Sequence, residues 1–239
     1  LSAEERHVLQ VASIMGTFFW FNLLQRMLQM DEETLNRYLT SLQRHQLVAE
    51  ENIQEDMGMR FTFVSTLMRE ATYESMLLPQ RKAFHRQCGE LIEEWLEERE
   101  GQVNSLNQVY GYLAYHYEMA GILDKQMHFH IKTAQVAESL HANEEALWHL
   151  GRALEVSETL LSNGEMEEAT EEERIEIYRQ QFEILAKRRW ILMLMADVNA
   201  SIDDALRALA LTEGPLDEEP GLRVDAILMY VSSSTNTLI

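Results

Sequence analysis

The sequence predicts an all-α protein that carries one small β-hairpin. Only 10 of its 239 residues are glycine and 3 are proline, so residues that interrupt helices are scarce. Through most of the chain, apolar side chains recur at spacings of three and four, which is the pattern of amphipathic helices. Two short β-rich runs stand apart from this pattern, Leu47-Val48-Ala49 and Phe61-Thr62-Phe63-Val64, with Gly58 between them. Such a pair predicts a hairpin.

The first predicted module covers residues 1–78. Ser2 and Glu5 form a capping-box pattern at the start of a helix. A second short helix is expected from about Phe19 to Leu28, and Asp31 caps a third. Three helices followed by a hairpin are the outline of a winged helix.

Residues 79–239 are predicted to form stacked helix pairs. A helix that Ser65 or Thr66 caps leads to Pro79, a residue favoured in the first turn of a helix. Small residues then alternate with large apolar ones, as Ala114, Ala134 and Ala153 do with their leucine and tyrosine neighbours. Small residues let paired helices approach closely, so a helical solenoid is expected. Helices are expected at about 80–99, 105–120, 123–140, 142–162, 171–189, 190–212 and from about 222.

The charge of the chain argues against nucleic acid and membranes as partners. Its formal net charge is −20, which repels phosphate backbones and anionic lipid. The helix that would read DNA begins with Asp31, Glu32 and Glu33, so its first turn is acidic. No run of about 18 apolar residues and no signal-peptide pattern is present. With a single cysteine, these features predict a cytoplasmic location.

No residue pattern in the chain indicates catalysis or a bound metal. Cys88 lies on the apolar face of its predicted helix and is expected in the core. His128 and His130 would lie on opposite faces of one helix, so they do not chelate. The paired carboxylates fall in charge runs of solvated faces, and no phosphate-binding glycine loop occurs. We therefore expect no catalytic, cofactor-binding or metal-binding residue, and no enzyme activity.

Packing positions along the chain carry a family resemblance. The first group of these positions begins at Glu5-Arg6 and ends at Tyr73 and His85. It includes Phe61, Phe63 and Leu67-Met68-Arg69-Glu70. Later ones are Leu113-Ala114, Ala120-Gly121, Asn143-Glu144-Glu145-Ala146, Arg152-Ala153-Leu154-Glu155, and Arg188-Arg189-Trp190 with Ala196-Asp197. This pattern resembles the winged helix and tetratricopeptide-like repeats that follow the P-loop ATPase domain in large bacterial STAND-type (AAA-like) signalling ATPases, including transcriptional regulators and cyclase-linked proteins.

The resemblance implies a piece of a longer regulatory protein. ATP or ADP and magnesium would belong to a nucleotide-binding domain upstream, since the chain contains no P-loop motif. Ser65, Arg69, Glu70 and Tyr73 would contact that domain. The family commonly has histidine where Ser65 stands here, which puts a nucleotide-sensing role of this position in doubt. The implied function is non-catalytic: partner or ligand binding at the repeats is relayed to the ATPase domain.

A protein or peptide partner is expected on the repeats, and oligomerisation is possible. An extended solenoid surface suits such a partner. The alternatives stay open: part of a DNA-binding transcriptional activator, or the regulatory region of a nucleotide cyclase or protein kinase. The basic cluster that contains Arg188 and Arg189 could instead serve only to balance the negative C-terminal end of its helix dipole. Candidate partner residues are Tyr112, Tyr115, Phe129 and Trp148, with Arg188, Arg189 and Trp190 of the basic cluster.

Overall fold

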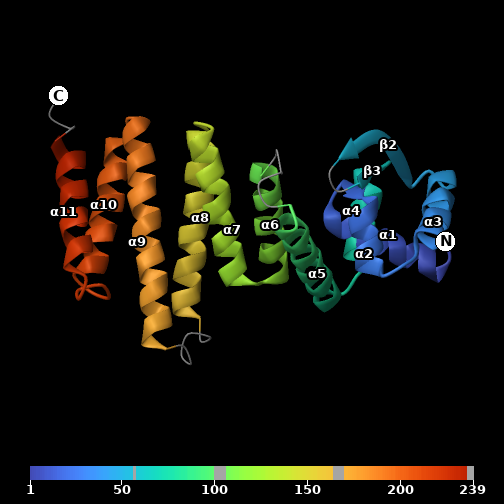
Figure 1. Ribbon diagram of the computed structural model, residues 1–239, viewed down its shortest axis with the longest axis horizontal. Helices are drawn as coiled ribbons and strands as arrows, with labels where there is room; N and C mark the ends of the chain where they lie inside the picture. Colours follow the sequence, from blue (N-terminus) through green and yellow to red (C-terminus); the bar gives the residue numbers. More distant parts are fainter. Residues whose placement is uncertain (56–57, 100–105, 164–169, 236–239) are drawn as a thin grey trace. The chain divides into compact units, whose positions relative to one another are not determined.

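A computed structural model of the chain describes residues 1–55, 58–99, 106–163 and 170–235 (Figure 1). It divides into two compact units. The first contains Leu1–Asn104 and Tyr115–Ile122, and the second contains Ser105–Ala114 and Leu123–Ile239. Helix α6 (Leu106–Ala120) contributes residues to both units. The predicted division of the chain into a winged-helix module, residues 1–78, and helical repeats, residues 79–239, remains a prediction.

The first unit has the element order of a winged helix followed by two helices (Figure 1). Its sheet is antiparallel with strand order β1-β3-β2, so the last strand along the chain lies in the centre. The elements are α1 (Ala3–Met15), β1 (Phe18–Trp20), α2 (Phe21–Leu28), α3 (Glu32–Arg44), β2 (Val48–Glu55), β3 (Gly58–Phe63), α4 (Thr66–Glu74) and α5 (Leu78–Glu97).

Strand β1 corrects the sequence prediction, which placed the start of a helix at about Phe19. Phe18 pairs with Thr62 and Trp20 with Arg60, so the predicted hairpin is one part of a three-stranded sheet. Phe19 is fully buried and stacks on Phe61 at 5.6 Å between ring centroids. Burial of this aromatic pair favours an extended conformation over a further turn of helix.

The predicted helix starts are confirmed where a capping residue marks them. The Ser2 hydroxyl accepts a hydrogen bond from Glu5 N, and the Glu5 carboxylate accepts one from Ser2 N. Asp31 caps α3 through Thr34 N at 2.8 Å. Pro79 lies in the first turn of α5, where its missing N–H would have no partner in any case.

The second unit is a series of helices in which each packs against the next in the chain (Figure 1). Alanines at the contacts, among them Ala134, Ala137, Ala146 and Ala153, are all buried, as their spacing predicted. The helices are α7 (Leu123–Ser139), α8 (Asn143–Ser162), α9 (Glu171–Leu194), α10 (Val198–Thr212) and α11 (Pro220–Thr235).

Helix α9 continues beyond the break that the sequence predicted after residue 189. The helix ends five residues later, at Leu194, and in the turn that follows Ala196 adopts a left-handed φ of 60°. Asp197 N donates to Leu192 O, and the Asp197 carboxylate then caps α10 through Ala200 N at 3.2 Å. The turn therefore follows the capping residue rather than the basic cluster.

The predicted fold class is confirmed: eleven helices and one small sheet lie within the residues that the structure describes. A search of the same residues for a helix long and apolar enough to cross a bilayer finds none.

Candidate functional site

The four residues predicted to contact another domain lie on or beside α4. Ser65 caps the helix, with its hydroxyl accepting from Met68 N at 3.4 Å. Arg69 turns inward and donates to Ser13 O of α1 at 3.4 Å. Glu70 points outward, and its carboxylate lies 3.9 Å from Arg69. Tyr73 is half-buried beneath the helix.

Tyr73 begins a chain of hydrogen-bonding groups inside the first unit. Its hydroxyl lies 3.0 Å from Nε2 of His85 on α5. Nδ1 of His85 lies 2.9 Å from Nδ1 of His116 on α6. Nε2 of His116 lies 3.6 Å from Sγ of Cys88, which is back on α5. This histidine chain therefore connects α4, α5 and α6, and its members His85, Cys88 and His116 are buried.

The contacts of the histidine chain are consistent with two neutral arrangements of its protons. Either Tyr73 donates to His85 and His116 donates to the Cys88 sulfur, or the Cys88 thiol donates and every bond points the other way. In both, one imidazole donates through Nδ1 and the other accepts. In either direction both nitrogens of each imidazole have a partner, so the two rings can be buried with their hydrogen bonds made.

Burial keeps the histidine chain uncharged at neutral pH. Burial, and then the positive charge of Arg81, lower the pKa of His85 to about 4. Burial and the neighbouring His85 hold the pKa of His116 well below its usual range. Burial also raises the pKa of the Cys88 thiol. Cys88 is thus a protonated core group, which makes it a poor nucleophile.

Two guanidinium groups lie over the Tyr73 ring. The Arg81 carbon Cζ is 5.0 Å from the ring centroid, and that of Arg69 is 5.9 Å away. Both cations gain from the negative face of the ring. Arg69 and Tyr73, which the sequence suggested for an interdomain contact, therefore make their described contacts within the first unit.

Several apolar side chains on and beside α4 are exposed, and the sequence analysis did not propose them as contact residues. No residue of the helix is buried. Leu67 is 74% exposed, and four more apolar side chains in the helix or near its ends are also exposed. The sequence held a signal for this exposure. A short helix packs along one side only, so apolar residues in it and at both of its ends cannot all be buried. We call these five residues the α4 surface: Val64, Leu67, Met68, Leu77 and Leu78.

The predicted aromatic partner residues divide into exposed and buried ones. Trp148 is 58% exposed, and Tyr115 is also exposed, with its ring edge against His85. Tyr112 is half-buried. Phe129 is 4% exposed and packs beside Tyr110, so it belongs to the core rather than to a surface. These residues are shared between the two units and do not form one described groove.

The basic cluster of α9 is used largely within the second unit. Arg188 Nε lies 3.0 Å from the buried carboxylate of Asp204 on α10. Arg189 donates to the hydroxyls of Ser232 and Ser233 on α11 at 3.0 and 3.3 Å. Burial raises the pKa of Asp204, while Arg188 opposes that shift. The two arginines join three helices, and Trp190 remains exposed.

A second histidine pair lies in the second unit. Nδ1 of His130 on α7 is 2.9 Å from Nδ1 of His149 on α8. The Trp148 ring contacts both imidazoles edge-on. Burial, followed by the nearby His149 and Arg152, lowers the pKa of His130 to about 4. Nε2 of His130 is buried and has no hydrogen-bond partner among the described residues.

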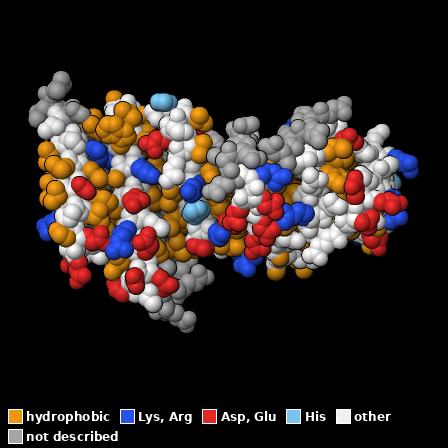
Figure 2. Space-filling view, viewed as in Figure 1, with side chains coloured by type: hydrophobic (Ala, Val, Ile, Leu, Met, Phe, Trp, Pro, Cys, Tyr) orange, Lys and Arg blue, Asp and Glu red, His pale blue; other side chains and the backbone are white. Residues whose placement is uncertain are grey.

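Helix α11 presents a further apolar face. Figure 2 shows hydrophobic side chains over the region of α10 and α11. One face of α11 packs inward through Ala226 and Ser233. The opposite face carries exposed residues at helical spacing: Val224, Ile227, Leu228 and Val231.

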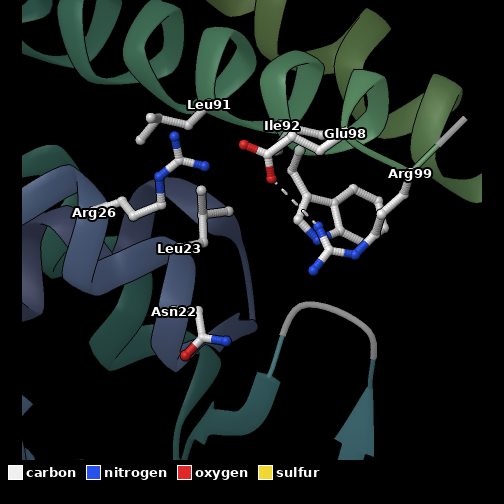
Figure 3. Close-up of a pocket in the computed structure, with 8 residues that line it drawn as sticks. Asn22, Leu23, Arg26, Leu91, Ile92, Glu98 and Arg99 are labelled. Carbon is white, nitrogen blue, oxygen red and sulfur yellow. Dashed lines mark ion pairs between the residues drawn. The ribbon is translucent and has the colours of Figure 1, made fainter.

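A pocket of about 200 Å³ lies between α2 and α5 in the first unit (Figure 3). Arg26 at its rim pairs with Glu94 at 2.6 Å, and Arg99 lies 3.6 Å from Glu98. Its lining combines apolar and polar side chains: Leu23, Leu91, Ile92 and Trp95 with Asn22, Arg26, Glu98 and Arg99.

Over residues 1–55, 58–99, 106–163 and 170–235, no group of three or more histidine, cysteine or acidic side chains is arranged to hold a metal ion. The histidine pairs have their Nδ1 atoms directed at each other. That geometry suits hydrogen bonding between neutral rings rather than shared coordination.

Comparison with solved structures finds a structural likeness of low score. The chain resembles the crystal structure of a Signal Transduction ATPase with Numerous Domains (STAND) protein with a tetratricopeptide repeat sensor from Pyrococcus horikoshii. The TM-score is 0.30 at 11% sequence identity, and the match covers 99% of this chain and 48% of that one. This chain thus spans about half the length of that protein. No family model and no curated protein sequence matches it.

Proposed function

We propose that this chain is a non-catalytic interaction region of a signalling ATPase, and that the α4 surface receives the nucleotide-binding domain. The observation that carries the proposal is the exposure of five large apolar side chains on and around a nine-residue helix that buries none of its own residues. Clustered exposed apolar groups mark sites of protein contact, since leaving them in water is unfavourable.

The histidine chain supplies a mechanical link from this surface to the helices beyond it. Movement of α4 would separate the Tyr73 hydroxyl from His85 and leave buried polar groups without partners. Helix α4 therefore either moves together with α5 or breaks the hydrogen bonds of the histidine chain. A partner that binds α4 differently in its ATP and ADP states would bias that two-state element.

The proposal assigns the helical repeats to partner binding rather than chemistry. The only cysteine is buried and protonated, and the exposed carboxylates lie in charge runs. The second unit offers the α11 face and the exposed rings of Trp148 and Trp190 as contact groups. Aromatic and aliphatic side chains of this kind carry much of the energy of protein interfaces.

DNA binding by the winged helix is the weaker alternative. The first turn of α3 carries Glu32 and Glu33, both exposed, and Asp31 caps it. Arg60 of the sheet is paired with Glu51 at 2.5 Å. This acidic entry would face phosphate groups and weaken binding.

Binding of the parent protein's P-loop domain to this chain tests the proposal. We expect Leu67→Ser together with Leu78→Ser to weaken that binding at least about tenfold, because contacts at the interface centre each contribute about 1 kcal/mol or more. The matched control is Leu194→Ser, which removes a leucine that is 60% exposed in the second unit. Equal loss in both variants, or no binding by the unaltered chain, would contradict the proposed role of α4.

A further inference from the structure

We propose that the pocket between α2 and α5 binds a small carboxylate that carries one aromatic ring. The site lies in the first unit and uses none of the residues of the α4 surface or the histidine chain. It would make the winged-helix unit a receptor for a small molecule in addition to its proposed protein contact.

The size of the pocket matches a single ring. Its volume is about 200 Å³. An apolar protein cavity of about 150 Å³ is large enough to take up benzene. One ring therefore fits with room for a short acidic group, whereas most drug-sized ligands need a pocket of about 300 Å³ or more.

The inner wall of the pocket is apolar. Ile92 is fully buried and Leu23 nearly so, and the Trp95 indole contributes an aromatic surface beside them. A ring placed against these three side chains would leave water, which is favourable in proportion to the apolar area removed. An aromatic ring would also gain edge or stacked contacts with the indole.

Arg99 is the group that selects a carboxylate. Its guanidinium carbon lies 5.2 Å from the Trp95 ring centroid, and Figure 3 shows the guanidinium directed toward the interior of the pocket. The 3.6 Å separation from Glu98 exceeds the roughly 2.7–2.9 Å of a charge-assisted hydrogen bond. Among the described residues, Arg99 has no closer carboxylate, whereas Arg26 has Glu94 at 2.6 Å. Arg99 thus keeps donors for a ligand.

The indole of Trp95 supplies a local reporter for the pocket. Its Nε1–H is buried and has no hydrogen-bond acceptor among the described residues. A buried donor without an acceptor is unfavourable and uncommon in native proteins. The N–H is already enclosed by the protein, so a ring bound against the indole changes its surroundings without bonding to it.

Titration of the whole 239-residue chain with phenylacetate tests the site, with 2-phenylacetamide as the uncharged control. The readout is the indole N–H resonance of Trp95 in a proton–nitrogen correlation spectrum, assigned through Trp95→Phe. The chain has four tryptophans, so the other three report on binding elsewhere. We expect a saturable shift at Trp95 alone, with a Kd on the order of 1 mM for so small a ligand, and at least about fivefold weaker binding of the amide.

The variant Arg99→Gln should weaken phenylacetate binding about fivefold or more and leave the amide unchanged. Arg223→Gln is the matched control, because Arg223 is an exposed arginine paired with Glu213 in the second unit. Equal affinity of acid and amide, equal shifts at the other tryptophans, or an unaltered affinity in Arg99→Gln would each overturn the proposal. So would the absence of a saturable shift up to about 10 mM, roughly ten times the expected Kd.

Discussion

The two buried histidine pairs have the same central geometry and different ends. His85 with His116 and His130 with His149 both join their Nδ1 atoms at 2.9 Å. The first pair continues to Tyr73 on one side and Cys88 on the other. In the second pair, the outer nitrogen of His130 has no hydrogen-bond partner among the described residues.

The difference shows how partners decide whether a buried polar pair stabilises a fold. The first pair has its hydrogen bonds satisfied along a continuous chain, so removing one member orphans its neighbours. In the second pair, Nε2 of His130 has no hydrogen-bond partner among the described residues, and the rings lie against the exposed Trp148 ring. The first pair should therefore contribute more to stability, which the following substitutions test.

His85→Ala should cause the largest loss, about 2–4 kcal/mol of the free energy of unfolding of the first unit. The change leaves the Tyr73 hydroxyl and His116 Nδ1 without their partner and opens a cavity. His149→Ala should cost less, about 1–2 kcal/mol, because only one described hydrogen bond is lost. Denaturant unfolding measures both, with His7→Ala as an exposed control. An equal loss at His85 and His149 would remove the distinction between the two pairs.

Acidification should destabilise the chain between about pH 6.5 and pH 4. The folded state holds the pKa of His85 and His130 at about 4, whereas the unfolded residues titrate near 6.5. Within that window the unfolded state binds more protons, so the free energy of unfolding falls as the pH falls. Unfolding curves at pH 7, 6 and 5 measure the slope.

Replacing the first pair by His85→Phe together with His116→Phe should reduce that slope, because two of the proton-binding groups are gone. The double variant also avoids leaving one histidine without its partner. An unchanged slope in this variant would show that the pH dependence arises from other groups.

Tyr73→Phe should have a smaller effect, a loss of about 1 kcal/mol. The ring remains beneath Arg69 and Arg81, and only the hydroxyl that meets His85 is removed. A loss much greater than this would mean that the histidine chain polarises as a unit. Thermal or denaturant unfolding of the purified variant provides the value.

Leu67→Ser should leave stability within about 0.5 kcal/mol of the unaltered chain. The side chain is 74% exposed and so contributes little to the core. The same unfolding experiment measures this variant. A large loss would show that α4 depends on Leu67 for its own packing, and that the α4 surface is not available to a partner.

Helix starts were predictable because their signals are local. Ser2, Asp31 and Pro79 each mark a terminus through residues within one turn. The third strand was not predictable in this way, since Phe19 takes its extended form from contact with Phe61, 42 residues later. Tertiary contact overrides local pattern in such short elements.

The candidate site was predictable in its location and not in its contacts. The family pattern drew attention to Arg69 and Tyr73, and both lie on α4. Their inward orientation depends on Ser13 and His85, which come from other helices and carry no local signal. The pairing of His85 with His116 likewise joins residues 31 positions apart. Sequence spacing within one helix cannot reveal such pairs.

Hydrogen–deuterium exchange at α4 is the measurement that tests the central claim most directly. It would be made on this chain alone and with the P-loop domain that we propose for the parent protein, loaded first with ADP and then with a non-hydrolysable ATP analogue. We expect the amides of Thr66–Glu74 to be protected by the domain, and to a different degree with each nucleotide. Protection that is absent, or equal in the two nucleotide states, would contradict the assignment of α4 as the surface that senses the ATPase.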